Sequence, residues 1–310
     1  SGQTTLDLSG DRVLAVMNYT PSIEVPTRFE ENQATQYEHR FSNLLAVPVG
    51  KRTFLRGSYS YFRGLNRPTS ETNNLSSRTE HDLADEIEYF LSRKTSAVFE
   101  HQFKERHFSE TLRDASQSIE HWFLPRFHYY FTPKTSVFLQ GGGGETSGGN
   151  GQFDSSNGRV SMGVRGRLTQ KSTVLINLGV LRKNLSENPP FVDDHTGPYL
   201  ELVWFYRPTA KTKIDVIGGS STEDSFFVGS SFLATRHLKV DVTQTLWRKL
   251  DLLLGGAYRD SAFAAVGNVR DNPDETGRRK DLQGTVSTGL LYHLRRARPV
   301  AAISILYTWD

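Results

Sequence analysis

Hydrophobic and polar residues alternate one by one along several long segments of the chain. In "STVLINLGVL", which begins at Ser172, Val174, Ile176 and Leu178 fall on one face of a strand, and Asn177 falls on the other. The segments "RVSMGVRGRL" and "DLQGTVSTGLLYHL" repeat the pattern. Such alternation predicts long β-strands with one apolar and one polar face. Globular strands average about 5–6 residues, whereas a strand that crosses a membrane needs about 9–11.

The pattern predicts fifteen strands, and a short run in "QTTLDL", before the turn-like "SGD", supplies a sixteenth. The fifteen lie near 11–20, 36–47, 53–63, 81–91, 96–107, 117–131, 135–145, 157–168, 172–184, 196–206, 212–221, 228–246, 250–262, 281–294 and 299–309. Bacterial single-chain barrels have even strand numbers. We therefore expect an all-β fold in one domain, residues 1–310: a transmembrane antiparallel up-and-down β-barrel of about 16 strands, with 14 to 18 allowed.

A short phrase recurs along the chain and opens a strand each time. Its four clear copies read "SRKTSAVF", "TPKTSVFL", "TQKSTVLI" and "TAKTKIDV". The clear and weaker copies begin at Gly50, Ser92, Thr132, Thr169, Thr209, Trp247 and Arg295. A spacing of roughly 37 to 48 residues is typical of repeat architectures. Each period holds two long strands, one short turn and one longer loop, which predicts consecutive hairpins rather than four-stranded propeller blades.

Alternation would also suit a soluble β-sandwich, whose apolar face points into a core. Three features favour a barrel in a membrane. The strands are long and uniform, and the loops alternate between short ("TPK", "TQK") and long ("GGGGETSGGNGQFDSS"). Aromatic residues also gather near strand ends, as in "HYYFTPK" and "VWFYRPT", where an interfacial girdle would lie. Arginine should then be excluded at Ile176 or Val286 and tolerated at Asn177 or Thr285.

Composition excludes several other classes. The chain has 310 residues and no cysteine, so it has neither disulfides nor thiolate metal sites. A net charge of +3 without a long basic run does not suggest nucleic acid. No apolar stretch reaches the length of a transmembrane helix. The mean hydropathy of −0.48 is that of a soluble protein, but transmembrane barrels also average out as hydrophilic because their strands alternate.

The segment "GPYLELVWFYRPTAKTKIDVIGGSSTEDSFFVGSSF", which begins at Gly197, resembles the family called putative β-barrel porin 2. The hairpins before it, with "SVFLQGGGGETS" and "GRVSMGVRGRLTQKSTVLINLGVLRKN", fit the same pattern. The resemblance implies a barrel in the bacterial outer membrane, associated with export of exopolysaccharide or capsule in Gram-negative bacteria. It places the short turns in the periplasm and the long loops outside. It also implies outer-membrane lipid, lipopolysaccharide and polysaccharide export proteins as partners, and no nucleic acid.

The polar face carries the candidate functional residues. Those expected to line the lumen are Arg56, Glu86, Glu88, Glu100, Lys104, Glu120, Arg126, Arg165, Arg167, Glu201, Asp215, Lys239, Asp241 and Arg259. Their mixed charge could tune what passes through a hydrophilic conduit. The alternative is that they pair across neighbouring strands and brace the wall.

Other motifs predict no cofactor, no metal site and no catalysis. "GGGG" at 141–144 lacks the helix and the Lys-Ser/Thr pair of a phosphate-binding loop. The repeated "EHRF", "EHQF" and "EHWF" place each Glu and its His on opposite strand faces, which disfavours a shared metal. No serine–histidine or aspartate–histidine set marks an enzyme.

The expected function is an outer-membrane channel that exports exopolysaccharide or another hydrated polymer. Two alternatives stay open. One is a general or solute-selective diffusion porin, constricted by a loop from 63–80 or 263–280. The other is a scaffold that sheathes or anchors a partner protein, such as a cytochrome conduit.

Overall fold

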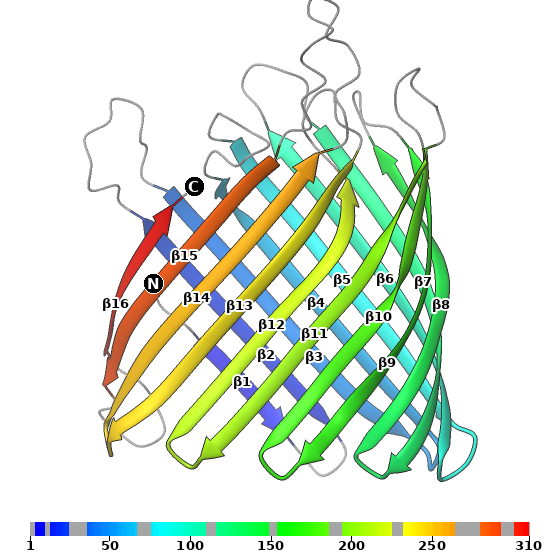
Figure 1. Cartoon of the computed structure of the whole chain (residues 1–310), viewed down its shortest axis with the longest axis horizontal. Coiled ribbons are helices and arrows are strands. Elements are labelled where there is room, and N and C mark those ends of the chain that lie inside the picture. The colour runs from blue at the N-terminus through cyan, green and yellow to red at the C-terminus, as the bar shows by residue number, and fades with distance from the viewer. Residues whose placement is uncertain are drawn as a thin grey trace, which may run out of the picture.

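The computed structural model describes residues 4–9, 13–24, 36–66, 76–109, 116–148, 154–185, 194–224, 232–263, 280–292 and 301–309. These residues form one curved antiparallel sheet of sixteen strands, in which each strand pairs with the next along the chain (Figure 1). The described pairings run from β1 to β16, and none of them joins β16 back to β1. The up-and-down, all-β architecture confirms the predicted fold class.

The strands are long and similar in length. They are β1 (Thr4–Ser9), β2 (Leu14–Glu24), β3 (Gln36–Val49), β4 (Thr53–Asn66), β5 (Ser76–Phe90), β6 (Thr95–Ser109), β7 (Ser116–Thr132), β8 (Thr135–Gly148), β9 (Ser155–Thr169), β10 (Ser172–Leu185), β11 (His195–Thr209), β12 (Thr212–Asp224), β13 (Phe232–Trp247), β14 (Leu250–Phe263), β15 (Lys280–Tyr292) and β16 (Ala301–Trp309). The side chains considered below belong to the fourteen strands β2–β15 and their turns.

The predicted strands are found, with differences at their ends. The sixteenth is β1, and β5 begins at Ser76 rather than at residue 81. The beginning of β5 reads "SSRTEHD", which is polar on both faces, so alternation gives no signal there. The predicted strand 228–246 is described only from Phe232, and the turn expected at 295–298 lies outside the described residues, as do most residues of the expected long loops.

The recurring phrase forms turns with a shared hydrogen-bond pattern. The hydroxyl of Thr132 accepts a hydrogen bond from the amide of Lys134 at 3.2 Å. The carbonyl of Lys134 accepts the amide of Arg167, in the next hairpin, at 2.9 Å. Equivalent hydroxyl–amide bonds join Ser92 to Lys94, Thr169 to Lys171 and Thr209 to Lys211. The carbonyls of these three lysines accept amides from Tyr130, Arg207 and Thr245. The phrase therefore closes its own turn and also ties that turn to the following hairpin.

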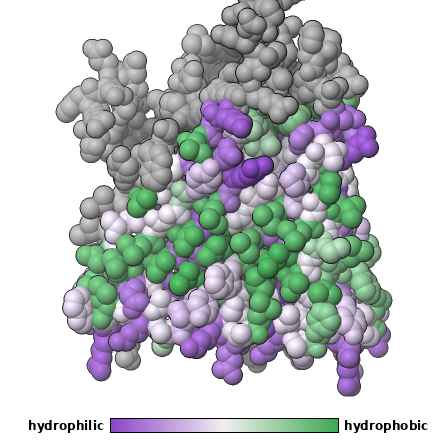
Figure 2. Space-filling view, in the orientation of Figure 1, coloured by the Kyte–Doolittle hydropathy of each residue, from purple (hydrophilic) through white to green (hydrophobic). Residues whose placement is uncertain are grey.

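One face of the sheet, here called the outer face, carries exposed hydrophobic side chains. Leu139, Val160 and Met162 expose 58%, 63% and 64% of their surface. Figure 2 shows a hydrophobic band across the middle of the side in view, with hydrophilic residues above and below it. A band of this extent is unfavourable in water and matches the lipid-facing belt of a transmembrane barrel. The opposite face, here called the inner face, carries the charged residues.

The sheet bends sharply around β7 and β8, at the right of Figure 1. Leu124 is fully buried and packs with Trp122 and Leu181, and Tyr199 lies against them; these four residues are called the inner cluster. The β7–β8 ladder lapses at Leu124 and Pro125. A Cβ atom at Gly142 would collide with the carbonyl oxygen of Phe123, so the two backbones approach too closely for any side chain there.

None of the described residues forms a helix long and apolar enough to cross a membrane. Circular dichroism of the protein in detergent should therefore give a β-rich spectrum almost without helical signal. The unheated protein should also migrate differently from the heated protein on a denaturing gel, because a folded barrel resists the detergent. A substantial helical signal would contradict the fold.

Candidate functional site

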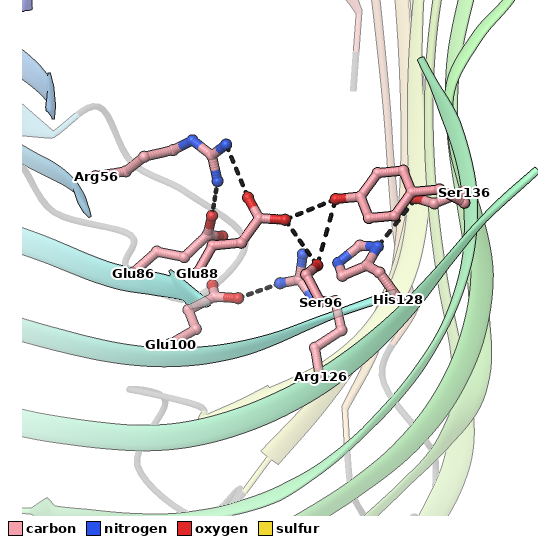
Figure 3. Close-up of polar contacts among 9 residues, drawn as sticks. Arg56, Glu86, Glu88, Ser96, Glu100, Arg126, His128 and Ser136 are labelled. Carbon is pink, nitrogen blue, oxygen red and sulfur yellow. Dashed lines mark hydrogen bonds and ion pairs between the residues drawn. The ribbon is translucent and has the colours of Figure 1, made fainter. Parts of the chain in front are cut away.

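A network of charges and hydroxyls lies on the inner face near the short turns (Figure 3). Arg56, on β4, pairs with Glu86 and donates to Glu88 at 3.1 Å. Glu88 is only 4% exposed, and it also accepts hydrogen bonds from the hydroxyls of Ser96, at 2.8 Å, and Tyr130, at 2.6 Å. A buried carboxylate is costly unless its oxygens are satisfied. Here one cation and two hydroxyls, from three other strands, satisfy Glu88.

A second ion pair lies beside this network. Arg126, on β7, pairs with Glu100, on β6, and both side chains are largely buried. The guanidinium of Arg126 also lies 5.3 Å from the centre of the Phe138 ring on β8, within the range of a cation–π contact. Since Arg126 is fixed on two sides, it contributes to the wall rather than projecting freely from it.

Glu80 is the centre of another charged group, farther along β5 from the short turns. It is 7% exposed and pairs with Arg78, with Lys104 at 2.9 Å and with Arg106 at 3.4 Å. Lys104 also approaches Asp82 at 3.6 Å. Arg78, Glu80 and Asp82 line a cavity of about 600 Å³ on the inner face. The three bases of this region thus all pair with one buried acid, Glu80.

Aromatic rings and charged groups meet around the inner cluster. The guanidinium of Arg159 lies 4.3 Å from the centre of the Tyr199 ring and 5.5 Å from that of Trp122. Trp122 donates to Glu120 at 2.6 Å, and the hydroxyl of Tyr199 donates to Glu201 at 3.2 Å. All but Glu201 line a cavity of about 450 Å³ on the inner face, which also reaches β4, β6 and β12.

The structure brings many of the fourteen predicted residues into ion pairs or hydrogen bonds on the inner face. Besides the contacts above, Asp215 and Asp241 are direct cross-strand partners. Each is neutralised by a lysine two residues away on its own strand, Lys213 for the first and Lys239, at 2.8 Å, for the second. Arg259 approaches Glu223 at 3.7 Å. These contacts accord with bracing of the wall, while the residues' part in selecting what passes stays a prediction.

Two further predicted residues also lie near the short turns. Arg165, on β9, lines a cavity together with Glu88 and Tyr130. Arg167 instead donates to the carbonyl of Gln170 in the β9–β10 turn, at 2.7 Å.

Several residues of the network were not predicted. Glu80, Ser96, Tyr130 and Arg159 share the inner face with the predicted residues. Their positions in the alternation could have identified them. Tyr130, for example, is four residues from Arg126 on the same strand, so both side chains point to the same face. Tyr130 was predicted only as part of the aromatic girdle.

The glutamate and histidine of "EHQF" and "EHWF" do point to opposite faces. Glu100 and Glu120 make the inner-face contacts described above, whereas the rings of His101 and His121 stack on the outer face, 5.8 Å apart. Across the described ranges, no three His, Asp or Glu side chains are grouped so that they could hold a metal ion.

Comparison with solved structures finds large outer-membrane transporters at very low identity. The FrpB iron transporter from Neisseria meningitidis is 8% identical, with a TM-score of 0.49, over 99% of this chain and 59% of that one. The siderophore receptor PirA from Pseudomonas aeruginosa is 7% identical, with a TM-score of 0.47, over 99% of this chain and 60% of that one. The chain thus spans about 60% of the length of these proteins. No functionally curated protein matches it.

Comparison with protein families gives a match over most of the chain. The model of the family described as "Putative beta-barrel porin 2" matches residues 98–303, from β6 to β16. The matched part contains the inner cluster and more than half of the residues drawn in Figure 3. The chain therefore belongs to the family described as "Putative beta-barrel porin 2", and it is a β-barrel protein of the bacterial outer membrane.

Proposed function

We propose that this barrel is the outer-membrane conduit through which a hydrated polysaccharide leaves the cell. The proposal goes beyond the fold and the outer-membrane location that family membership gives. Its support is the chemistry of the inner wall, together with the association of the resembled family with exopolysaccharide or capsule export.

The observation that carries the proposal is the balance of charge on the inner face. The fourteen predicted wall residues comprise seven bases and seven acids, and many of the described contacts pair opposite signs. A wall with one dominant sign would attract and retain counter-ions. A wall of paired charges instead offers many donors and acceptors of moderate strength. A conduit must bind its cargo weakly enough to release it.

Aromatic and hydroxyl groups complete a surface that suits sugars. Trp122, Tyr199 and Arg159 lie beside one another at the cavity of about 450 Å³, which serine side chains of β4 also line. Sugar rings present both hydroxyl edges and apolar C–H faces. Hydrogen bonds to the first and contact with the rings for the second would guide a chain without a deep binding pocket.

The proposed partners follow from the two kinds of surface. The hydrophobic belt would contact outer-membrane lipid and lipopolysaccharide, and the short turns would meet periplasmic or outer-membrane export proteins. We propose no enzymatic step and no nucleic-acid partner, since transport through the barrel requires only a continuous polar wall.

Deletion of the gene should reduce surface polysaccharide while synthesis at the inner membrane continues. Export would then be blocked after the polymer is made, so polymer or its lipid-linked precursor should accumulate inside the outer membrane. Surface glycan would be measured on intact cells and total glycan on lysates. Restoring the unchanged gene should return both values to those of the parent strain.

Unchanged surface glycan in the deletion strain would contradict the export proposal. If uptake of small solutes were lost at the same time, the diffusion-porin alternative would explain the barrel better. Copurification of a protein that fills the barrel from native membranes would instead favour the scaffold alternative.

A further inference from the structure

A small cavity lies on the inner face beside the short turns, apart from the two larger cavities. Its volume is about 170 Å³, and it is lined by Arg56, Glu88, His128, Tyr130, Pro133, Lys134, Ser136, Arg165 and Gly166. It is called the His128 cavity below. Short turns face the periplasm in barrels of this kind, so the cavity lies where a polymer would enter on its way out.

The cavity has a surplus of positive charge. Its single acid, Glu88, is already engaged by Arg56 and by the hydroxyls of Ser96 and Tyr130. Arg165 and Lys134 are both exposed, and neither side chain has an ion pair within the part of the chain that the structure describes. Two cations therefore face the cavity without a carboxylate of their own. This contrasts with the paired charges elsewhere on the inner wall.

His128 is a buried residue of this lining. Its side chain is 2% exposed, and its Nδ1 atom lies 3.0 Å from the hydroxyl of Ser136. Its Nε2 atom is buried and has no hydrogen-bond partner among the described residues. Figure 3 shows this second nitrogen on the side of the ring away from Ser136. His128 therefore shapes the wall of the cavity, and the exposed side chains of Arg165 and Lys134 are the groups that a ligand can reach.

The ring of His128 is held in place by its neighbours. It stacks on Tyr130, with ring centres 5.8 Å apart, and contacts Phe138 at 5.3 Å. The unpartnered nitrogen therefore belongs to a fixed group, not to a side chain free to turn toward another partner. The site is built before any ligand arrives.

We propose that the His128 cavity binds the carboxylate of an acidic sugar, a uronate residue, in the transported polymer. This inference rests on the proposed export function and narrows its substrate class. The guanidinium of Arg165 can hold a carboxylate through two parallel hydrogen bonds, and Lys134 adds a second charge. Tyr130 and Ser136 also line the cavity, and their hydroxyls can bond the hydroxyl groups of the same sugar. The volume admits a single sugar residue, being about six times the ~30 Å³ that one water occupies in the liquid.

Single-channel recording in planar bilayers tests the site. Tri-glucuronate and neutral maltotriose would be added on the side of the short turns of the purified barrel. Tri-glucuronate should interrupt the current at a concentration at least about tenfold lower, because its carboxylates can form charge-assisted hydrogen bonds that maltotriose cannot form. Equal effects of the two sugars would overturn the proposal, as would interruption by a sugar phosphate without interruption by tri-glucuronate.

Two arginines on the same strand provide a matched pair of variants. Arg165→Ser should remove most of the preference for tri-glucuronate, because Arg165 lines the cavity. Arg167→Ser removes the same charge two residues away, but Arg167 bonds the Gln170 carbonyl outside the cavity, so the preference should persist. Equal losses in both variants would show a general charge effect and refute the site.

Calorimetric titration of the detergent-solubilised protein compares the same two variants and does not require that the barrel conduct ions. Heat from tri-glucuronate that Arg165→Ser abolishes and Arg167→Ser retains would support the site. Absence of such heat in the unchanged protein would overturn it. These measurements use no cells, so their outcome is separate from the deletion experiment. If uronate bound but the deletion strain had normal surface glycan, the binding site would be supported and the export function would be rejected.

Discussion

Val286→Arg should abolish assembly of the folded barrel. Val286 is the seventh of the thirteen residues of β15, so it lies near the middle of the strand, and 49% of its surface is exposed on the outer face. An arginine facing lipid at this depth costs about 2–4 kcal/mol. That is a large share of the ~5–15 kcal/mol that stabilises an ordinary domain. The heat-modifiable band of the folded protein in outer-membrane fractions measures the loss.

Thr285→Arg is the matched control. Thr285 precedes Val286 and therefore points to the inner face, where it pairs with Ala257 on β14. An arginine there meets the polar interior, so the heat-modifiable band should remain. Similar losses in both variants would mean that the two faces are wrongly assigned. Asn177, which alternation alone also offered as a tolerant position, is not suitable, because it is 3% exposed and bonded to Gln140.

Gly142→Val should destabilise the barrel strongly at the bend of the sheet. A Cβ at this position collides with the carbonyl oxygen of Phe123 and approaches both the Cα and the Cδ2 of Leu124 to 3.0 Å. A backbone carbonyl held in a sheet cannot move aside as a flexible side chain can. Overpacking costs about 1–3 kcal/mol where side chains can adjust, and more where the backbone must move. The midpoint of urea unfolding, followed by tryptophan fluorescence, should fall markedly.

The adjacent Gly141→Val provides the comparison. A Cβ at Gly141 has the carbonyl oxygen of Arg159, at 3.9 Å, as its nearest neighbour, which is an ordinary contact. Valine also has a higher propensity for the strand conformation than glycine has. The unfolding midpoint should therefore stay the same or rise. Equal falls for both variants would show that the glycine run is needed for flexibility in general and not for close approach at Gly142.

Alternation along the chain was sufficient to predict most of the strands and the face to which their side chains point. The reason is that side chains on a strand alternate with a period of two, whatever the rest of the fold does. The turns were predictable for a similar reason, since the hydroxyl of Thr132 and the amide of Lys134 are two residues apart. Both signals are local, so a single sequence contains them.

The partners within the site were not predictable in this way. Glu88 on β5 accepts a hydrogen bond from Tyr130 on β7, across the intervening β6. That contact depends on the relative register of three strands and on the curvature of the sheet. The inner cluster depends on the bend between β7 and β10. Small residues such as Gly142 permit this bend, but their presence in the sequence does not predict it. The first residues of β5 were not predicted either, because they are polar on both faces and show no alternation.

The inner cluster has a consequence for the proposed export function. Trp122, Leu124, Leu181 and Tyr199 lie together on the inner face beside the bend, and three of them, Trp122, Leu181 and Tyr199, line the cavity of about 450 Å³. If a polymer passes along this wall, the cluster would limit its thickness more than its mass. A slender linear chain would then pass end first, whatever its length. A branched chain of equal mass would meet the cluster at every branch point and would be held back.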